Sequence, residues 1–176
     1  KAKAATLLSQ ITTIMSAGDE IRVSSAHNEV VNATTIHTFP GTKAAPCYML
    51  CIDYSTDAIS TGAIISTGNG GYNLSIRGSL YCYGVAFKNG IGSSSSSSII
   101  LGESPTSTQI YQNCEFHNVT TGSVSRIQAS GSTGGDISLF NCGVSFAAAS
   151  QGLNLPRCNL VIDGMSLLSG STSPTA

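Results

Sequence analysis

The stretch Leu80-Tyr81-Cys82-Tyr83-Gly84-Val85-Ala86-Phe87 decides the fold of this chain. It joins two short β-prone runs through a single glycine. Because glycine accepts a left-handed backbone at the least cost, one glycine between two strands predicts a sharp bend and not a hairpin. The same pattern of strand, one-residue corner and strand recurs three more times towards the C-terminus, at intervals of 21 to 30 residues. An internal repeat of this kind is typical of a solenoid.

Aligning the four copies predicts which side chains stack on one another. The copies are residues 83–87, 112–116, 142–146 and 163–167. In a β-solenoid each strand pairs in parallel with its equivalent one repeat further on, about 4.8 Å away, so equivalent side chains form ladders. The predicted corner ladder contains Gly84, Asn113, Gly143 and Gly164. Two inward ladders are predicted, one of Phe87, Phe116, Phe146 and Leu167, and one of Val85, Cys114, Val144 and Met165.

A third strand is predicted upstream of each pair, at residues 74–76, 99–101, 124–127 and 153–155. Three strands per repeat predict an all-β fold, a single-stranded parallel β-helix with three strands per coil. Burial of the inward ladders should supply most of its stability.

The N-terminal segment has a different periodicity. Over residues 4–15, apolar side chains recur at helical spacing, and Gly18 ends the pattern: Leu7, Leu8, Ile11, Ile14 and Met15. A solenoid must cover its first coil, so this helix is predicted to cap the open end. The expected organisation is a capping helix at 1–18, a parallel β-helix at 19–168, and a linker or the start of a further C-terminal region at 169–176.

Composition narrows the range of partners. Only 10% of the residues are charged and the net charge is −1, so no basic stripe is present to neutralise a nucleic acid. The apolar runs are far shorter than the roughly 20 residues that a membrane-spanning helix needs. The chain combines few charges with 41% hydrophobic residues. This balance predicts that partner subunits cover much of its surface.

The sequence offers no recognisable metal or cofactor site. The six cysteines show no CxxC pair: Cys47, Cys51, Cys82, Cys114, Cys142 and Cys158. Most lie in alternating apolar segments, which predicts buried free thiols and suits assembly in a reducing cytoplasm. No cofactor and no metal are expected.

Catalytic patterns are also missing. A polysaccharide-cleaving site needs clustered carboxylates, but the acidic residues do not align in the predicted register: Asp53, Asp57, Glu103, Glu115, Asp136 and Asp163. Glu115 is predicted to point outwards, with Ala86, Ser145 and Ser166 as ladder neighbours. His27, His37 and His117 show no Ser-His-Asp order and are predicted to lie on the surface or in loops. The protein is therefore expected not to be an enzyme.

Several motifs carry a resemblance to known proteins. The run Ala17-Gly18-Asp19-Glu20-Ile21-Arg22-Val23 resembles the opening of pectin-lyase-like right-handed parallel β-helices, in which Gly-Asp-x-Ile-x-Val forms the first strand. The segments at 23–27, 40–42 and 80–87 are similar to proteins carried by tailed bacteriophages. The resemblance covers residues 4–167 and implies a right-handed helix.

The resemblance implies a structural protein on the surface of a virion, assembled in the cytoplasm of the bacterial host. The first expectation is a homotrimeric capsid-decoration protein that binds the major capsid protein. One alternative is a segment of a tail fibre or tailspike that binds host glycans. The other is a polysaccharide lyase or hydrolase of the pectin-lyase-like type. Neither a nucleic acid nor a membrane is an expected partner.

Overall fold

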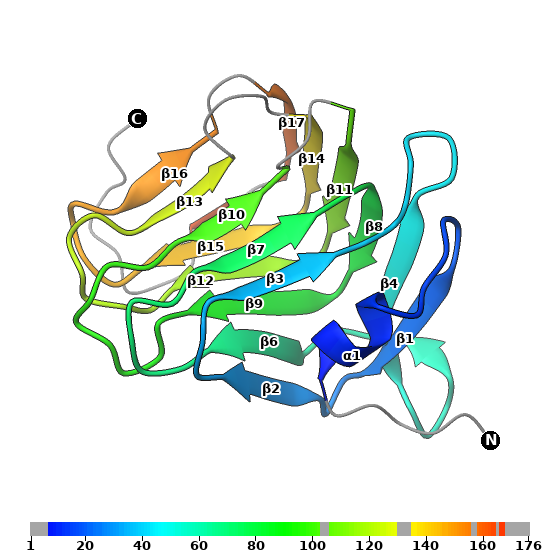
Figure 1. Ribbon diagram of the computed structural model, residues 1–176, viewed down its shortest axis with the longest axis horizontal. Helices are drawn as coiled ribbons and strands as arrows, with labels where there is room; N and C mark the ends of the chain where they lie inside the picture. Colours follow the sequence, from blue (N-terminus) through cyan, green and yellow to red (C-terminus); the bar gives the residue numbers. More distant parts are fainter. Residues whose placement is uncertain (1–6, 103–105, 130–134, 156–157, 165, 168–176) are drawn as a thin grey trace.

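The computed structural model describes residues 7–102, 106–129, 135–155, 158–164 and 166–167. It is a mostly β structure in which parallel strands stack along one axis, with a short helix at one end (Figure 1). The predicted all-β parallel solenoid is thus confirmed. Its elements are α1 (Leu8–Thr12), β1 (Glu20–Ser24), β2 (Asn28–Val31), β3 (Thr35–Thr38), β4 (Cys47–Asp53), β5 (Ala58–Ile59), β6 (Ala63–Thr67), β7 (Leu74–Arg77), β8 (Leu80–Tyr83), β9 (Val85–Asn89), β10 (Ile99–Leu101), β11 (Thr108–Gln112), β12 (Glu115–Asn118), β13 (Arg126–Ala129), β14 (Asp136–Phe140), β15 (Gly143–Phe146), β16 (Gly152–Asn154), β17 (Asn159–Asp163) and β18 (Ser166–Leu167).

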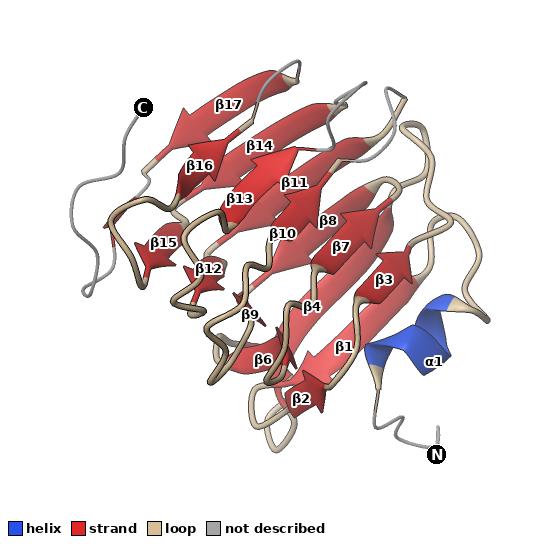
Figure 2. Cartoon of the chain, turned by 60° about the vertical axis from the view of Figure 1, so that its left-hand side comes forward, coloured by secondary structure: helices blue, strands red, loops and turns tan. Residues whose placement is uncertain are grey.

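The strands form three sheets. The seven-stranded sheet has the order β1-β4-β8-β11-β14-β17, with β5 paired to β4. The five-stranded sheet has the order β16-β13-β10-β7-β3, and the six-stranded sheet the order β18-β15-β12-β9-β6-β2. Apart from β4 and β5, consecutive strands enter different sheets, so that β7, β8 and β9 each pair with a strand about one repeat away (Figure 2). Among the described strands, only the pairing of β4 with β5 is antiparallel.

The core lies between the three sheets. The Phe87 and Phe116 rings stack with centroids 5.5 Å apart, and the Tyr111 ring meets both edge-on, at 6.0 Å and 5.2 Å. All three side chains are fully buried. Burial of one such side chain contributes about 1.5–3 kcal/mol, so a column of them holds successive windings together.

The predicted stacking holds for the first two copies and fails at the third. Phe87 pairs with Phe116, but Phe116 pairs with Val144, and Phe146 lies beside Asn118. The third copy is therefore displaced by two residues from the predicted alignment. A shift of two keeps every side chain on its face of the strand, so Phe146 and Val144 are still buried. In the fourth copy the Leu167 backbone pairs with Val144.

The same displacement changes the corner ladder. Asn141, with φ 49°, occupies the left-handed corner of the third copy, and Gly143 lies within β15 beside Glu115. The other corners are as predicted: Gly84 (φ 75°), Asn113 (φ 52°) and Gly164 (φ 70°). Asparagine tolerates this backbone next best after glycine.

The second inward ladder is changed in the same way. Continuing the register of β9, β12 and β15 places Cys114 beside Val85, and Cys142 beside Cys114 in the position predicted for Val144. Both thiols are buried. Met165 lies outside the described residues.

The helix is shorter than predicted. α1 covers Leu8–Thr12 in place of residues 4–15, of which 4–6 lie outside the described residues. Leu8 is buried, and Ile11 and Met15 pack against the core, but Ile14 is 81% exposed. The β-branched pair Thr12 and Thr13 lies where the helix ends, and such residues lose side-chain freedom in a helix. The predicted linker at 169–176 also lies outside the described residues.

Candidate functional site

Apolar side chains cover much of the outward face of the seven-stranded sheet. Along β8, β11 and β14 alternate residues enter the core, and the residues between them point outwards. The outward face of a sheet is usually polar. Here it carries an apolar group, which we call the aromatic strip: Tyr48, Leu50, Tyr81, Tyr83, Ile110, Phe140 and Val161. Tyr48 is 39% and Val161 50% exposed, and the other members are partly buried.

The parallel register arranges the outward residues in two rows. One row contains Tyr48, Tyr81, Ile110, Ser138 and Val161, and the other contains Leu50, Tyr83, Gln112, Phe140 and Asp163. The rows cross five strands from β4 to β17, so the strip extends about 19 Å along the solenoid. Residues far apart in the sequence thus form one continuous surface.

The tyrosines of the strip are held in place by neighbours. The Tyr48 and Tyr81 rings lie 6.0 Å apart with an angle of 53° between them. The Tyr81 hydroxyl donates to Gln112 Oε1 at 2.7 Å, and Asn113 Nδ2 donates to the Tyr83 hydroxyl at 2.6 Å. Burial raises the pKa of Tyr81, so this hydroxyl stays a donor at neutral pH. A surface ordered in this way loses little entropy when a partner covers it.

Charged and amide groups surround the strip. At the β1 end, Arg22 contacts Glu20 at 2.7 Å and Asp57 at 2.6 Å, and these two hydrogen bonds raise the pKa of the guanidinium. Along one edge, Asp136 accepts from Lys43 Nζ at 2.6 Å and from Asn159 Nδ2 at 2.8 Å. Hydrogen bonds from Lys43 and then Asn159 lower the pKa of Asp136, so the carboxylate stays ionised.

Comparisons with protein-family models, curated proteins and solved structures find no match to this chain. Across the described ranges, no helix is long and apolar enough to cross a membrane. The described His, Cys, Asp and Glu side chains also form no group of three or more that could hold a metal ion. The surfaces of the solenoid therefore provide the main indication of function.

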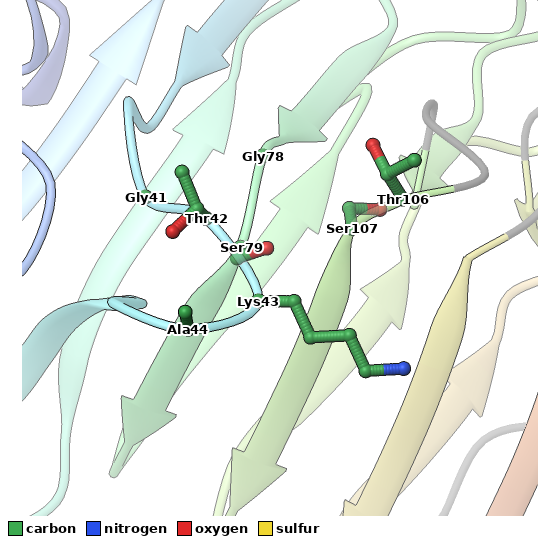
Figure 3. A pocket seen from close by; sticks show the side chains of 8 residues that line it. All are labelled: Gly41, Thr42, Lys43, Ala44, Gly78, Ser79, Thr106 and Ser107. Carbon is green, nitrogen blue, oxygen red and sulfur yellow. The ribbon is translucent and has the colours of Figure 1, made fainter.

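A crevice of about 330 Å³ lies where the loops before β4, β8 and β11 meet (Figure 3). It is lined by Gly41, Thr42, Lys43, Ala44, Gly78, Ser79, Thr106 and Ser107. Lys43 extends from it to Asp136, so its ammonium group is already paired. A Cβ on Gly41 would lie 2.2 Å from the Ser79 carbonyl oxygen, so a glycine is needed there for the chain to pass. The crevice is rich in hydroxyl groups and has no carboxylate among its lining residues.

The carboxylates named from the sequence have separate local roles. Asp53 accepts from the Ser55 amide and hydroxyl within its own turn. Asp57 pairs with Arg22 and Asp136 with Lys43. Asp163 is exposed at the end of β17, and Glu103 lies outside the described residues. None of these contacts places two carboxylates on one substrate position, as glycoside hydrolysis requires.

The three histidines lie in different surroundings, and the prediction of a surface or loop position is wrong for His37. His37 points inwards from β3 and is fully buried. His27 lies in the turn before β2, with Nε2 3.4 Å from Glu29 Oε2. His117 is partly buried on the outward face of the six-stranded sheet.

His117 lies between Glu115 and Ser145, which the sequence predicts to be direct ladder neighbours. Its Nδ1 lies 2.7 Å from Ser145 Oγ and its Nε2 lies 2.8 Å from Glu115 Oε2. The predicted neighbour of Glu115 in β15 was Ser145, but Gly143 occupies that position, and Ser145 lies beside His117 because of the two-residue displacement. The signal that could have revealed the group was the second corner-forming residue, Asn141.

This order of hydrogen bonds is that of a nucleophile, a base and an orienting carboxylate. Acyl transfer also needs free backbone N–H groups aimed at the oxyanion. The amides of Gly143 and Ala147, on either side of Ser145, donate to the Cys114 and Asn118 carbonyls. These two N–H groups are therefore already used in strand pairing and are not aimed at an oxyanion. Glu115, His117 and Ser145 are best described as a polar ladder that joins β12 to β15.

The cysteines are free thiols, five of them buried and Cys158 partly exposed. The Cys82 and Cys114 sulfur atoms lie 3.7 Å apart. Burial raises the pKa of Cys82 well above its ordinary value and that of Cys142 to about 12. Protonated thiols are weak nucleophiles and ligands, so these side chains act as small apolar groups in the core.

Proposed function

We propose that this protein is a structural subunit of a tailed-phage particle, that it acts as a homotrimer, and that the aromatic strip is the surface through which the copies meet. The observation that carries the proposal is the aromatic strip itself, an ordered apolar surface about 19 Å long on a chain with few charges. We also infer that the solenoid is right-handed with three strands in each coil, in keeping with its resemblance to pectin-lyase-like proteins.

The composition of the strip and its surroundings matches the anatomy of a protein interface. Interfaces have an apolar centre rich in tyrosine and a polar rim that includes arginine. Here Tyr48, Tyr81 and Tyr83 lie in the centre, and the Arg22 and Asp136 groups lie at the rim. Because the rim of an interface stays accessible to water, these paired charges keep much of their hydration when the copies meet.

The size of the strip sets how far the contact extends. A standard interface covers about 800 Å² on each partner. The aromatic strip, with two rows of side chains over about 19 Å, provides a smaller area than this. The contact therefore extends to the rim, including Arg22 at one end and Asn113 and Asn141 along the side. The Asn141 amide donates to Asn113 Oδ1 at 2.5 Å, which fixes that edge.

The oligomeric state tests the proposal directly. Light scattering after size exclusion should give the mass of a trimer for the unmodified protein. Ile110→Arg places a cation in the middle of the strip and should yield monomers. Val30→Arg is the matched control, because Val30 is 47% exposed on the outward face of the six-stranded sheet. A monomeric unmodified protein, or an Ile110→Arg variant that stays trimeric, would defeat this interface.

The position on the particle needs a separate experiment. Capsid decoration is our first choice, with the major capsid protein as partner, because the phage-type resemblance includes shell proteins and a rigid solenoid with few charges resists proteolysis. Gold-labelled antibody should mark the shell of intact virions. Label confined to the tail would contradict this position.

One observation favours a second function, the binding of host glycans by a tail fibre or tailspike. Tyrosine rings on a flat exposed surface can stack against sugar rings, and the Tyr48 ring is accessible beside Tyr81. Calorimetric titration with capsular oligosaccharides should then show binding that Tyr48→Ala removes and Val30→Ala retains. Equal binding by both variants would exclude the strip as a glycan site.

A further inference from the structure

A buried carboxylate contacts the N-terminal helix. Glu29 points inwards from β2, and its side chain has no exposed surface. Its Oε2 accepts the backbone N–H of Leu8, the first residue of α1, at 2.7 Å, whereas Oε1 has no hydrogen-bond partner among the described residues. Leu7, which precedes the helix, supplies no side-chain cap. The helix start is therefore held by a residue 21 positions further along the chain.

A buried histidine lies in the same winding. His37 points inwards from β3, the strand against which α1 packs. Within the part of the chain that the structure describes, neither ring nitrogen has a hydrogen-bond partner. A buried imidazole without an acceptor is tolerated only while it is neutral. Burial accordingly lowers the pKa of His37 to about 4.

The described surroundings contain little that could compensate a charge on His37. α1 has no acidic or basic residue in its first or last turn. The register partners of Glu29 and His37 are Ile65 in β6 and Ile76 in β7. The other titratable group at Glu29 is His27, at 3.4 Å, and Arg77 pairs with Thr38, on the opposite face of the strands from His37.

We propose that α1 is an acid-released plug on the N-terminal end of the solenoid, in which His37 senses protons and Glu29 holds the helix in place. At neutral pH the carboxylate and the burial of Leu8 keep α1 closed over the first winding. A five-residue helix is too short to persist alone, so release is equivalent to its unfolding. The edge of β3, the last strand of its sheet and the strand against which α1 packs, then becomes accessible.

The direction of the pH effect follows from the two states. In the open state water reaches His37, and its pKa returns to about 6.5. Above pH 6.5, His37 is neutral in both states and does not change the opening equilibrium of α1. As the pH falls from 6.5 towards 4, protonation of His37 in the open state increasingly favours opening. The opening equilibrium should rise about 30-fold between pH 7.5 and pH 5.

Hydrogen exchange read by mass spectrometry tests the proposal on the full chain. The opening constant of residues 8–12, corrected for the intrinsic pH dependence of exchange, should rise about 30-fold between pH 7.5 and 5. β9 in the core should not follow. His37→Leu should remove the rise, and His117→Leu, which alters a histidine on the outward face, should keep it. Glu29→Gln should increase opening already at pH 7.5.

An α1 opening constant that does not change with pH, or a rise that survives in His37→Leu, would overturn the proposal. If His37→Leu does not fold, an NMR titration of the unmodified protein decides. A His37 ring that titrates near 6.5 while α1 stays protected would contradict the plug. A ring that stays neutral until α1 loses protection supports it.

Discussion

The Phe87 ring stacks on the Phe116 ring at 5.5 Å with 17° between their planes, inside a core that connects three sheets. Phe116 contacts Tyr111 edge-on as well, so one side chain joins the seven-stranded sheet to the six-stranded sheet. Such contacts hold successive windings together in the core, beside the strand hydrogen bonds and the side-chain hydrogen bonds on the outward faces. The stability of the solenoid should therefore depend strongly on single ladder positions.

Phe116→Ala should lower the free energy of unfolding by about 3–5 kcal/mol, because it opens a cavity between Phe87 and Tyr111. Phe116→Leu, which fills most of the space, should cost less than half of that. Urea denaturation followed by circular dichroism measures both. Phe140→Ala is the control, because Phe140 is partly exposed on the outward face. Equal losses for Phe116→Ala and Phe140→Ala would show that the stacked column is not the main source of stability.

Asn141→Ala should destabilise the protein by about 1–2 kcal/mol more than Asn141→Gly, because φ is 49° at this corner and alanine does not readily adopt a left-handed backbone. Both variants lose the hydrogen bond to Asn113, so their difference isolates the backbone conformation. Thermal unfolding of the two variants provides the measurement. Ser138→Ala, on the outward face of β14, is the control for loss of a polar side chain. Identical stability of the alanine and glycine variants would contradict a left-handed corner at Asn141.

The corner shows how far the sequence determines this fold. Gly84 is identifiable because it stands alone between two apolar runs. In the third copy Asn141 and Gly143 can both form a corner, and the choice between them moves the register by two residues. Because the side-chain period of a strand is two, both alignments bury the same residues. Only the pairing with β12, 28 residues earlier, selects Asn141, as its hydrogen bond to Asn113 shows.

The candidate site was less accessible to sequence reasoning. Tyr48 and Tyr81 are ordinary outward residues of two separate strands, and only the register of β4 with β8 makes them neighbours. The position of His37 is also hard to predict from the sequence. The neighbouring Ile36 is apolar and would be expected to face the core in its place. The structure exposes Ile36 by 44% and buries His37. The packing of α1 and β7 around β3 overrides the preference of the individual residues.

His37 should make the protein less stable in acid. Its pKa is lowered to about 4 in the folded state and is about 6.5 in the unfolded chain. Its contribution is therefore fully present above pH 6.5 and is lost as the pH falls through that value towards 4. About 2–3 kcal/mol of stability should disappear between pH 7.5 and 4.5 through this group. Urea unfolding at the two pH values measures the loss, and His37→Leu should reduce it by that amount while His117→Leu should not. An unchanged pH dependence in His37→Leu would disprove the assignment.

The thiols should differ sharply in reactivity. Cys158 is partly exposed, whereas the other five are buried, and burial raises the pKa of Cys47, Cys51, Cys82 and Cys142. An aromatic disulfide reagent at pH 8 should modify one thiol of the native protein quickly and the remaining thiols only after urea is added, since the thiolate is the reacting species. Cys158→Ser should abolish the fast phase and leave the slow phase intact. Rapid modification of several thiols in the native protein would mean that the buried Cys82, Cys114 and Cys142 become accessible to solvent. A closely packed core does not allow this.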